Sequence, residues 1–471
     1  MPPVRPELAG VIVETQAGPV EGQVGGNVTS FKGIPYAAPP FGANRFLPPQ
    51  PPAPWTEVRP AFDFGPVPPQ SPYPEPFRSL LGDSGSSGQD CLSLNVWTPT
   101  TGGSRLPVMV WIHGGAFLRG SSAVPAYDGT RFARDGVVCV SLNYRLGADG
   151  CICLGGKGGN FGLLDQIAGL GWVRDNIAAF GGDPDNVTVF GQSAGAFSIA
   201  SLLAIKDSAG LFQRAILQSG AGHHVTTPAT AERIATMLCE RLEAKPTLES
   251  LAEVPHDRFV AAQAELGTEL VLAPDPARWG EVAVNGMMFE PVIDGVVLAG
   301  RPIDVLNAGA SADVELLIGT TTEEWRFFVV PNGVIDYLTE DHVLRRAAAY
   351  GLDPAQALAR YRDAQPQAAA GDLHAAMVTD WFYRIPAIRL AEARQRDGGA
   401  VHMYEFAWRS PLFNGRLGSC HALELGYVFN NLDRTGPMTG DHPPQQVADE
   451  MHRAWIAFAR TGDPGWPSYH P

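Results

Sequence analysis

One serine lies in a pattern that suits nucleophilic catalysis. Ser193 is the centre of Gly191-Gln-Ser-Ala-Gly195, which follows the β-rich run Asn186-Val-Thr-Val-Phe190 and precedes a helix-like segment at 196–204. The pattern predicts a sharp strand-to-helix turn that exposes the serine hydroxyl, and crowding at such a turn requires small flanking residues. The following helix would direct its positive amino end at the site. A glycine-rich turn with an incidental serine is the alternative.

A second glycine motif could bind negative charge. His113-Gly-Gly-Ala-Phe117 directly follows a long apolar run that we expect to be a buried strand. Glycines leave backbone N–H groups accessible, so Gly114, Gly115 and the N–H of Ala194 could form an oxyanion hole. We expect His113 to brace the loop rather than act as a base.

A serine nucleophile needs a base, and the base needs an acid. In α/β-hydrolases the chain order is serine, acid, histidine, which limits the base to histidines after Ser193. His421 follows an expected strand and is the best placed, whereas His223 and His224 could line a pocket. His402 lies within a strand pattern. We expect surface positions for the rest, which are His342, His374, His442, His452 and His470.

Two neighbouring carboxylates compete for the role of the acid. Glu323 and Glu324 follow the expected strand at 314–319, from whose carboxyl end a carboxylate could project into the site. Spacing alone leaves both open, and both could also be solvated loop charges.

Expected strands alternate with helical stretches along the chain, which predicts a mostly parallel sheet with helices on both faces. We expect one domain over 1–471, with a cap or lateral lobe at 226–310. The proline-rich segment at 39–76 reads as extended surface loop. The expected strands are 106–113, 136–144, 186–190, 314–319 and 400–408, and the expected helices are 163–180, 196–204 and 445–460.

The composition limits the partners. A formal net charge of −15 lacks the basic face that nucleic acids require and gives no reason to bind an anionic membrane. No apolar run approaches the length of a membrane span, and 1–10 lacks a signal-peptide pattern, so we expect a cytoplasmic protein. Six cysteines are too few for a disulfide scaffold, and Cys151-x-Cys153 alone is weak evidence for a metal. We expect no metal and no cofactor.

At this point the chain closely resembles the type-B carboxylesterase family, which includes bacterial para-nitrobenzyl esterases and the cholinesterases. The resemblance covers nearly the whole chain, and many ordered matches are more specific than one motif. The matching segments are Phe31–Ala37, Asp90–Trp97, His113–Phe117, Asn143–Gly147, Asn160–Gln166, Gly181–Pro184 and Val187–Gly195.

The resemblance implies an α/β-hydrolase fold and a catalytic triad. Ser193 would be the nucleophile, His421 the base and Glu324 the acid, with Glu323 at the preceding acidic position. It also implies that Gly114, Gly115 and Ala194 supply the oxyanion N–H groups. Ser219 would lie behind the triad, and Arg145 and Asp165 would form a structural ion pair.

Some positions depart from the family pattern. Cys91 lacks the upstream partner of secreted members, so we expect a free thiol. Gln89 replaces a glutamate that often pairs with an arginine, here Arg45, which argues against that ion pair. Trp325 and Ala422 replace common glycines after the acid and after the base, and both add bulk near the triad.

The combined prediction is a serine carboxylesterase that acts on small-molecule esters, with short acyl or aryl groups. Phe117 and Trp325 flank the catalytic motifs and are our candidates for pocket walls. A carbamate or amide hydrolase with the same triad is the enzymatic alternative. A non-catalytic, cholinesterase-like binding protein is less favoured, because the three triad residues are present. The oligomeric state is not predicted.

Overall fold

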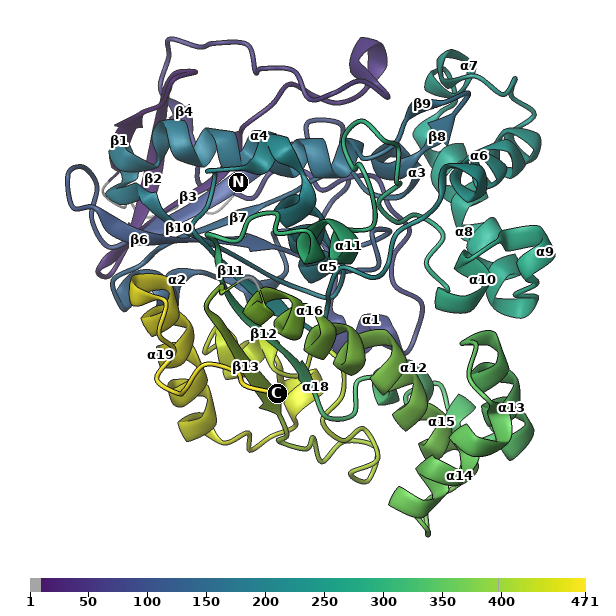
Figure 1. Cartoon of the computed structure of the whole chain (residues 1–471). Coiled ribbons are helices and arrows are strands. Elements are labelled where there is room, and N and C mark those ends of the chain that lie inside the picture. Colours follow the sequence, from purple (N-terminus) through teal and green to yellow (C-terminus); the bar gives the residue numbers. More distant parts are fainter. Residues whose placement is uncertain (1–9, 397) are drawn as a thin grey trace.

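One mixed sheet runs through the computed structural model, which describes residues 10–396 and 398–471 (Figure 1). Residues 1–9 lie outside the described residues. They make up most of the segment 1–10, where no signal peptide is expected. Along the sheet the strands lie in the order β1 (Gly10–Glu14), β2 (Pro19–Gly25), β3 (Val28–Pro35), β5 (Ser93–Thr98), β7 (Val138–Leu142), β6 (Leu106–Ile112), β10 (Gly182–Gln192), β11 (Arg214–Gln218), β12 (Glu315–Thr321) and β13 (Val401–Phe406), and β4 (Arg59–Pro60) pairs with β2.

The two halves of the sheet differ in strand direction. The run from β7 through β6, β10, β11 and β12 to β13 is parallel throughout, as the alternating pattern predicts. The run from β1 to β7 is antiparallel, and its first strands were not predicted. A mostly parallel sheet flanked by helices confirms the predicted α/β class.

Strand residues alternate between two buried faces. In β6, Val108, Val110 and Ile112 join the apolar core on one face, while Met109 and Trp111 join the core on the other. This explains the uninterrupted apolar run of that strand. The first face is covered by α4 (Phe161–Asn176), α5 (Ala194–Ala204), α11 (Pro302–Asn307) and α16 (Ile385–Arg396), and the second by α2 (Thr130–Arg134), α17 (Leu425–Val428) and α19 (Gln445–Thr461).

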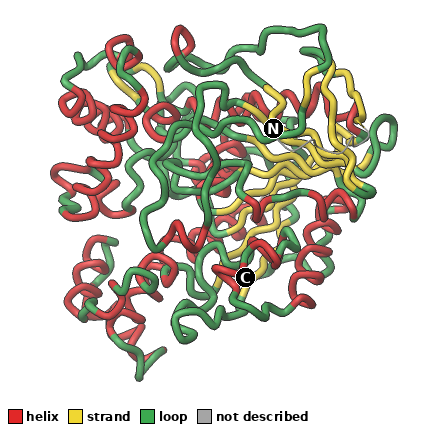
Figure 2. Tube along the Cα trace, turned by 180° about the vertical axis from the view of Figure 1, so that it is seen from behind, coloured by secondary structure: helices red, strands yellow, loops and turns green. Residues whose placement is uncertain are grey.

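Two groups of helices extend beyond the strands. The first contains α6 (Pro228–Leu242), α7 (Leu248–Ala252), α8 (His256–Leu272), α9 (Pro276–Trp279) and α10 (Val282–Asn285), within the expected lobe at 226–310. The second contains α12 (Arg326–Val329), α13 (Glu340–Ala349), α14 (Pro354–Ala364) and α15 (Ala370–Thr379). Figure 2 shows both groups at the end of the molecule away from most of the strands.

The two helical groups are joined by a hydrogen bond. Arg346 of α13 donates from Nη1 to the carbonyl of Val284 in α10, at 3.1 Å. The second group was not predicted, because its helices are short and contact mainly one another. The assignment of 1–471 to one domain with a lobe at 226–310 stays a prediction.

Short helices elsewhere are α1 (Phe77–Leu81), α3 (Gly147–Cys151) and α18 (Gly436–Thr439). The short strand β8 (Cys153–Leu154) pairs with β9 (Lys157–Gly158).

Two histidines expected on the surface are buried. His452 donates from Nδ1 to the carbonyl of Val428, at 2.7 Å, and packs its ring on Phe132. His374 lies inside the second helical group. The expectation was wrong because a polar sequence context does not reveal which side of a helix faces the core.

Two buried arginines form ion pairs with buried carboxylates. Arg145 Nη2 lies 2.7 Å from Asp165 Oδ1, and both side chains are buried, as the resemblance implies. Arg45 pairs with Asp149 at 2.9 Å, so Asp149 supplies the carboxylate that Gln89 cannot. All six cysteines are unpaired. None of the described helices is both long and apolar enough to cross a membrane.

Candidate active site

Ser193 lies where the chain order of the parallel strands reverses. From β6 the chain continues to β7 on one side, whereas β10 lies on the other, which is the kind of switch point where α/β proteins bind ligands. Ser193 follows the carboxyl end of β10, and Gly114 follows that of β6. The two motifs of the sequence therefore meet at one edge of the sheet.

The backbone at Ser193 is strained as the motif predicts. Its φ of 57° and ψ of −123° are a conformation that side chains rarely adopt, and it joins β10 directly to α5. The Ser193 N–H donates to the carbonyl of Gln218 in the next strand, at 2.9 Å. The neighbouring helix end directs its positive dipole at the serine.

The flanking glycines are required by close backbone contact. A Cβ on Gly195 would lie 2.0 Å from the carbonyl oxygen of Ile112, and one on Gly191 would lie 2.7 Å from the same atom. Real Cβ atoms do not approach so closely, so β6 can pass beside the turn only if both positions lack side chains. The G-x-S-x-G spacing is thus a packing requirement of this turn.

The loop after β6 brings further N–H groups to the serine. A Cβ on Gly114 would lie 3.2 Å from the Cβ of Ser193. Within the described chain the N–H groups of Gly114 and Gly115 donate no hydrogen bond. Ala194 is the first residue of α5, so its N–H has no acceptor within the helix. These three N–H groups are available to an anionic oxygen.

His113 braces this loop, as its position before the glycines predicts. It is buried, donates from Nδ1 to the Gly114 carbonyl at 2.8 Å, and stacks on Tyr144 with ring centroids 4.5 Å apart. Tyr144 in turn donates its hydroxyl to the His113 carbonyl, at 2.7 Å. Burial lowers the pKa of His113 to about 4, so the ring is neutral at pH 7.

The structure places Glu324, not Glu323, against His421. Nδ1 of His421 lies 2.6 Å from Oε2 of Glu324, whose other oxygen accepts from the Thr321 N–H at 2.8 Å. Glu324 is completely buried. Glu323 instead pairs with Arg326 and Arg409. Neighbouring sequence positions thus point to opposite sides of the loop, which spacing could not distinguish.

The imidazole of His421 is enclosed on several sides. Its centroid lies 4.9 Å from the ring of Tyr383 and 5.3 Å from that of Phe328. The side-chain nitrogen of Gln192 lies 3.0 Å from Nε2 and 3.4 Å from Nδ1. Gln192 and Tyr383 were missed as site residues, although Gln192 occupies the variable position just before Ser193.

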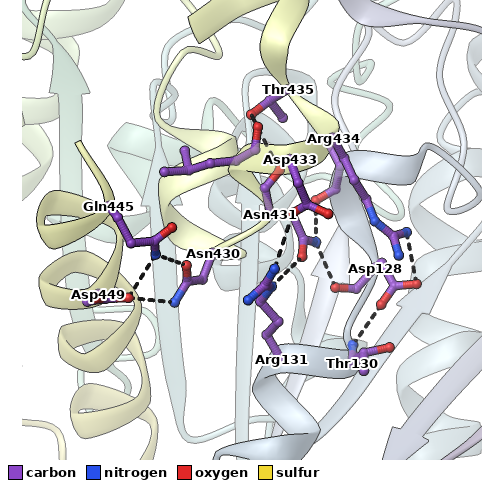
Figure 3. A network of polar contacts seen from close by, with 12 residues as sticks. Asp128, Thr130, Arg131, Asn430, Asn431, Asp433, Arg434, Thr435, Gln445 and Asp449 are labelled. Carbon is purple, nitrogen blue, oxygen red and sulfur yellow. Dashed lines mark hydrogen bonds and ion pairs between the residues drawn. The ribbon is translucent and has the colours of Figure 1, made fainter. Parts of the chain in front are cut away.

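The chain after His421 is anchored to the far side of the sheet. Figure 3 shows Asn431 between Arg131 of α2 and Asp128, and Arg434 beside the same aspartate. Asn431 donates from Nδ2 to the Asp128 carbonyl at 3.0 Å and accepts from Arg131 Nε at 3.3 Å. Arg434 lies 3.2 Å from the Asp128 carboxylate. These contacts connect the segment after His421 to α2 and to the turn before it.

A second buried carboxyl lies behind the pair. Glu424 accepts from Nε2 of Gln218 at 3.1 Å, and its other oxygen has no partner in the described chain. Burial, with a smaller contribution from the charge of Glu324, raises the pKa of Glu424 to about 8. The carboxyl of Glu424 is therefore neutral near pH 7.

Ser219, expected behind the triad, follows β11. Its hydroxyl is buried and has no partner in the described chain.

The two candidate pocket walls differ in placement. Trp325 is half-buried and packs its ring on Phe328 and Phe382, at 4.6 and 5.7 Å. Phe117 is buried in the main core with a positive φ of 58°. Ala422, after His421, also has a positive φ of 66°, a conformation that glycine adopts more readily than alanine. Their roles in binding stay predictions.

No group of three or more His, Cys, Asp or Glu side chains suited to a metal occurs among the described residues. The buried carboxylate, the imidazole, the hydroxyl and the free N–H groups together provide a nucleophile, a base and anion-binding donors. Such a set suits acyl transfer.

The sequence and the fold match known proteins over almost their full lengths. The model of the carboxylesterase family matches residues 9–470. The chain is 40% identical to a para-nitrobenzyl esterase of Bacillus subtilis (strain 168), covering 98% of this chain and 92% of that protein. It is 37% identical to a phenmedipham hydrolase of Pseudarthrobacter oxydans, covering 97% of this chain and 92% of that protein. A crystal structure of a Geobacillus stearothermophilus carboxylesterase at pH 6.2 superimposes with a TM-score of 0.85, at 38% identity, covering 97% and 94%.

Proposed function

The chain belongs to the carboxylesterase family and is a carboxylic ester hydrolase, and from this premise we propose that Ser193 is its nucleophile. His421 is the general base, and Glu324 orients it. The contact between His421 and the buried Glu324 at 2.6 Å, beside the strained turn of Ser193, carries the proposal. Because Nδ1–H donates to Glu324, neutral His421 has its lone pair on Nε2, the nitrogen that can take a proton.

The reaction has two stages. Ser193 Oγ attacks the ester carbonyl while Nε2 of His421 takes the hydroxyl proton. The tetrahedral intermediate then breaks its bond to the alcohol, which leaves with that proton. Water next attacks the acyl-enzyme and gives a proton to His421, and Ser193 regains the proton as the carboxylic acid leaves.

The negative oxygen of both intermediates would bind the N–H groups of Gly114, Gly115 and Ala194. This is supported by their lack of acceptors in the described structure and by the short approach of Gly114 to Ser193. The fold fixes these donors in place before the reaction, so little reorganisation accompanies the appearance of charge. Removal of one such donor typically lowers kcat by about 10²–10³-fold.

The substrate class we propose is a small ester with an aryl or short acyl group. An aromatic series extends from His421 through Phe328 and Trp325 to Phe382, with successive centroids 4.6 to 5.7 Å apart. Such a surface favours flat apolar groups. The para-nitrobenzyl esterase among the relatives supports aryl-containing esters. Phe117 we assign to the packing that supports the oxyanion loop.

We propose that the protein acts in the cytoplasm. The unpaired state of all six buried cysteines supports this location, because oxidising compartments favour disulfides.

A stopped-flow assay with para-nitrophenyl butyrate tests the mechanism. The wild-type protein should release about one equivalent of para-nitrophenol per active site in a burst, and Ser193→Ala should lose the burst. Ser198→Ala is the matched control, because Ser198 is a buried serine of the adjoining helix α5 and accepts a hydrogen bond from Gln166 instead. Equal hydrolysis by the wild type and Ser193→Ala would refute the proposal.

A further inference from the structure

We propose that Gln192 is a positioning residue that holds the imidazole of His421 by placing its side-chain amide against the face of the ring. This inference rests on the proposed function of His421. It assigns a role to the residue between Gly191 and Ser193, which the G-x-S-x-G pattern leaves undefined.

The first observation is the placement of the amide nitrogen. It lies 3.0 Å from Nε2 and 3.4 Å from Nδ1 of His421. Two similar distances place the nitrogen against the face of the ring, rather than at the end of one lone pair. The in-plane positions stay open, so Nδ1–H can donate to Glu324 and Nε2 can face Ser193.

The second observation is the fit of Gln192 between three parts of the site. It is buried, and its strand pairs it with Gln218. Its amide oxygen lies 3.1 Å from where a Cβ on Gly114 would stand. The oxygen therefore turns toward the glycine loop and the nitrogen toward the base, and the absence of a side chain at Gly114 makes room for this orientation.

The third observation is that no polar group on the described chain competes for this face. Apart from Glu324 and Gln192, the ring contacts that we find are with Phe327, Phe328 and Tyr383. Within this part of the structure His421 and Ser193 share no hydrogen bond. The amide thus limits rotation of the ring while Nε2 remains free for the serine proton.

Residue 192 lies close enough to the ring for its charge to act on the base. The amide of Gln192 has no net charge. Replacing it with a carboxylate would place an opposite charge beside the ring, and an opposite charge within about 4–6 Å favours the imidazolium. As the pH is lowered, His421 of this variant would therefore bind a proton at a higher pH than in the wild type. Its activity would fall at that higher pH.

Other titratable groups near the ring do not obscure this effect. Burial raises the pKa values of Tyr383, Tyr404 and Cys420 well above their ordinary values, so these groups stay neutral on the acid side. Glu424, with a pKa raised to about 8, stays protonated there. Glu323 forms ion pairs with Arg326 and Arg409. The acidic limb of the rate profile therefore reports on the His421–Glu324 pair.

The experiment compares kcat/KM against pH for Gln192→Glu and Gln192→Met. In Gln192→Glu the midpoint of the acidic limb should move up by about one pH unit or more. Gln192→Met should keep the limb within about half a unit but lower the plateau by about tenfold, since a misplaced base reacts slowly. Gln166→Met, which removes a buried glutamine bonded to Ser198, should change neither quantity.

Urea-unfolding midpoints establish that each variant is folded. An unmoved acidic limb in Gln192→Glu, or an undiminished plateau in Gln192→Met, would overturn the role of Gln192. Ser193→Ala separates the two proposals. If that variant still hydrolyses the ester, the proposed mechanism fails; if it is inactive and the Gln192 variants behave as wild type, only this inference fails.

Discussion

Replacement of Glu290 by glutamine should stabilise the protein at neutral and alkaline pH, by an amount that grows with pH. Glu290 is buried at the base of the first helical group. It accepts from Nδ2 of Asn285 at 2.9 and 3.0 Å and from the Thr226 hydroxyl at 3.3 Å. Burial raises its pKa from 4.5 to about 8, against a smaller lowering by these hydrogen bonds. Among the described residues, Glu290 forms no ion pair with a positive side chain.

The sign follows from proton binding. Between pH 4.5 and 8 the folded protein keeps the Glu290 proton while the unfolded chain loses it, so the free energy of unfolding falls as pH rises. Each pH unit contributes about 1.4 kcal/mol. The difference of 3.5 units between 4.5 and 8 therefore corresponds to a total on the order of 5 kcal/mol. Glutamine does not titrate and keeps a carbonyl oxygen for Asn285.

Urea unfolding of the wild type and Glu290→Gln at about pH 5.5 and 7.5 measures this difference. The advantage of the variant should increase by about 3 kcal/mol between the two pH values. Glu265→Gln is the control, because Glu265 is an exposed carboxylate paired with Arg241, and its difference from wild type should be small at both. A Glu290→Gln difference that does not change with pH would refute the reasoning.

Three further substitutions test the packing of the site. Gly195→Ala should lower the free energy of unfolding by about 3 kcal/mol and abolish the burst, because its Cβ would lie 2.0 Å from the Ile112 carbonyl; urea unfolding that matches the wild type would contradict this. Asp165→Asn should cost about 3–5 kcal/mol in the same assay, since it leaves Arg145 buried without its charge partner. Trp325→Ala should raise the ratio of kcat/KM for para-nitrophenyl octanoate over acetate by about tenfold, because it shortens the aromatic wall; an unchanged ratio would place Trp325 outside the pocket.

The chemistry-bearing positions could be predicted because local packing restricts them. Gly191 and Gly195 must lack side chains where β6 passes, so the motif around Ser193 carries its geometry in the sequence. The apolar run of β6 likewise reveals a strand buried on both faces. Five of the six strands of the parallel half overlap expected strands, and β11 (Arg214–Gln218) was not among those expected.

Other features depend on contacts between distant segments, which a single sequence does not specify. Glu323 and Glu324 differ only in which side of the loop they face. Asp149 lies 104 positions from Arg45, so nothing local indicates their pairing. The side chain of Gln192 gains its significance only when the loop of His421 folds over it.

No helix was predicted in the second group. Val343 and Leu373 come from α13 and α15 and pack in a small core of their own. The antiparallel strands β1 and β2 are half exposed, and no continuous apolar run marks them. Sequence patterns predict elements that face the main core more readily than elements that face solvent or one another.

The most direct test of the central claim is to find the acyl group. The protein is mixed with para-nitrophenyl butyrate, quenched in acid during the burst, digested and analysed by peptide mass spectrometry. The account predicts a butyryl group on Ser193, absent from Ser193→Ala and retained in Ser198→Ala. A butyryl group on another residue, with the burst intact in Ser193→Ala, would contradict it.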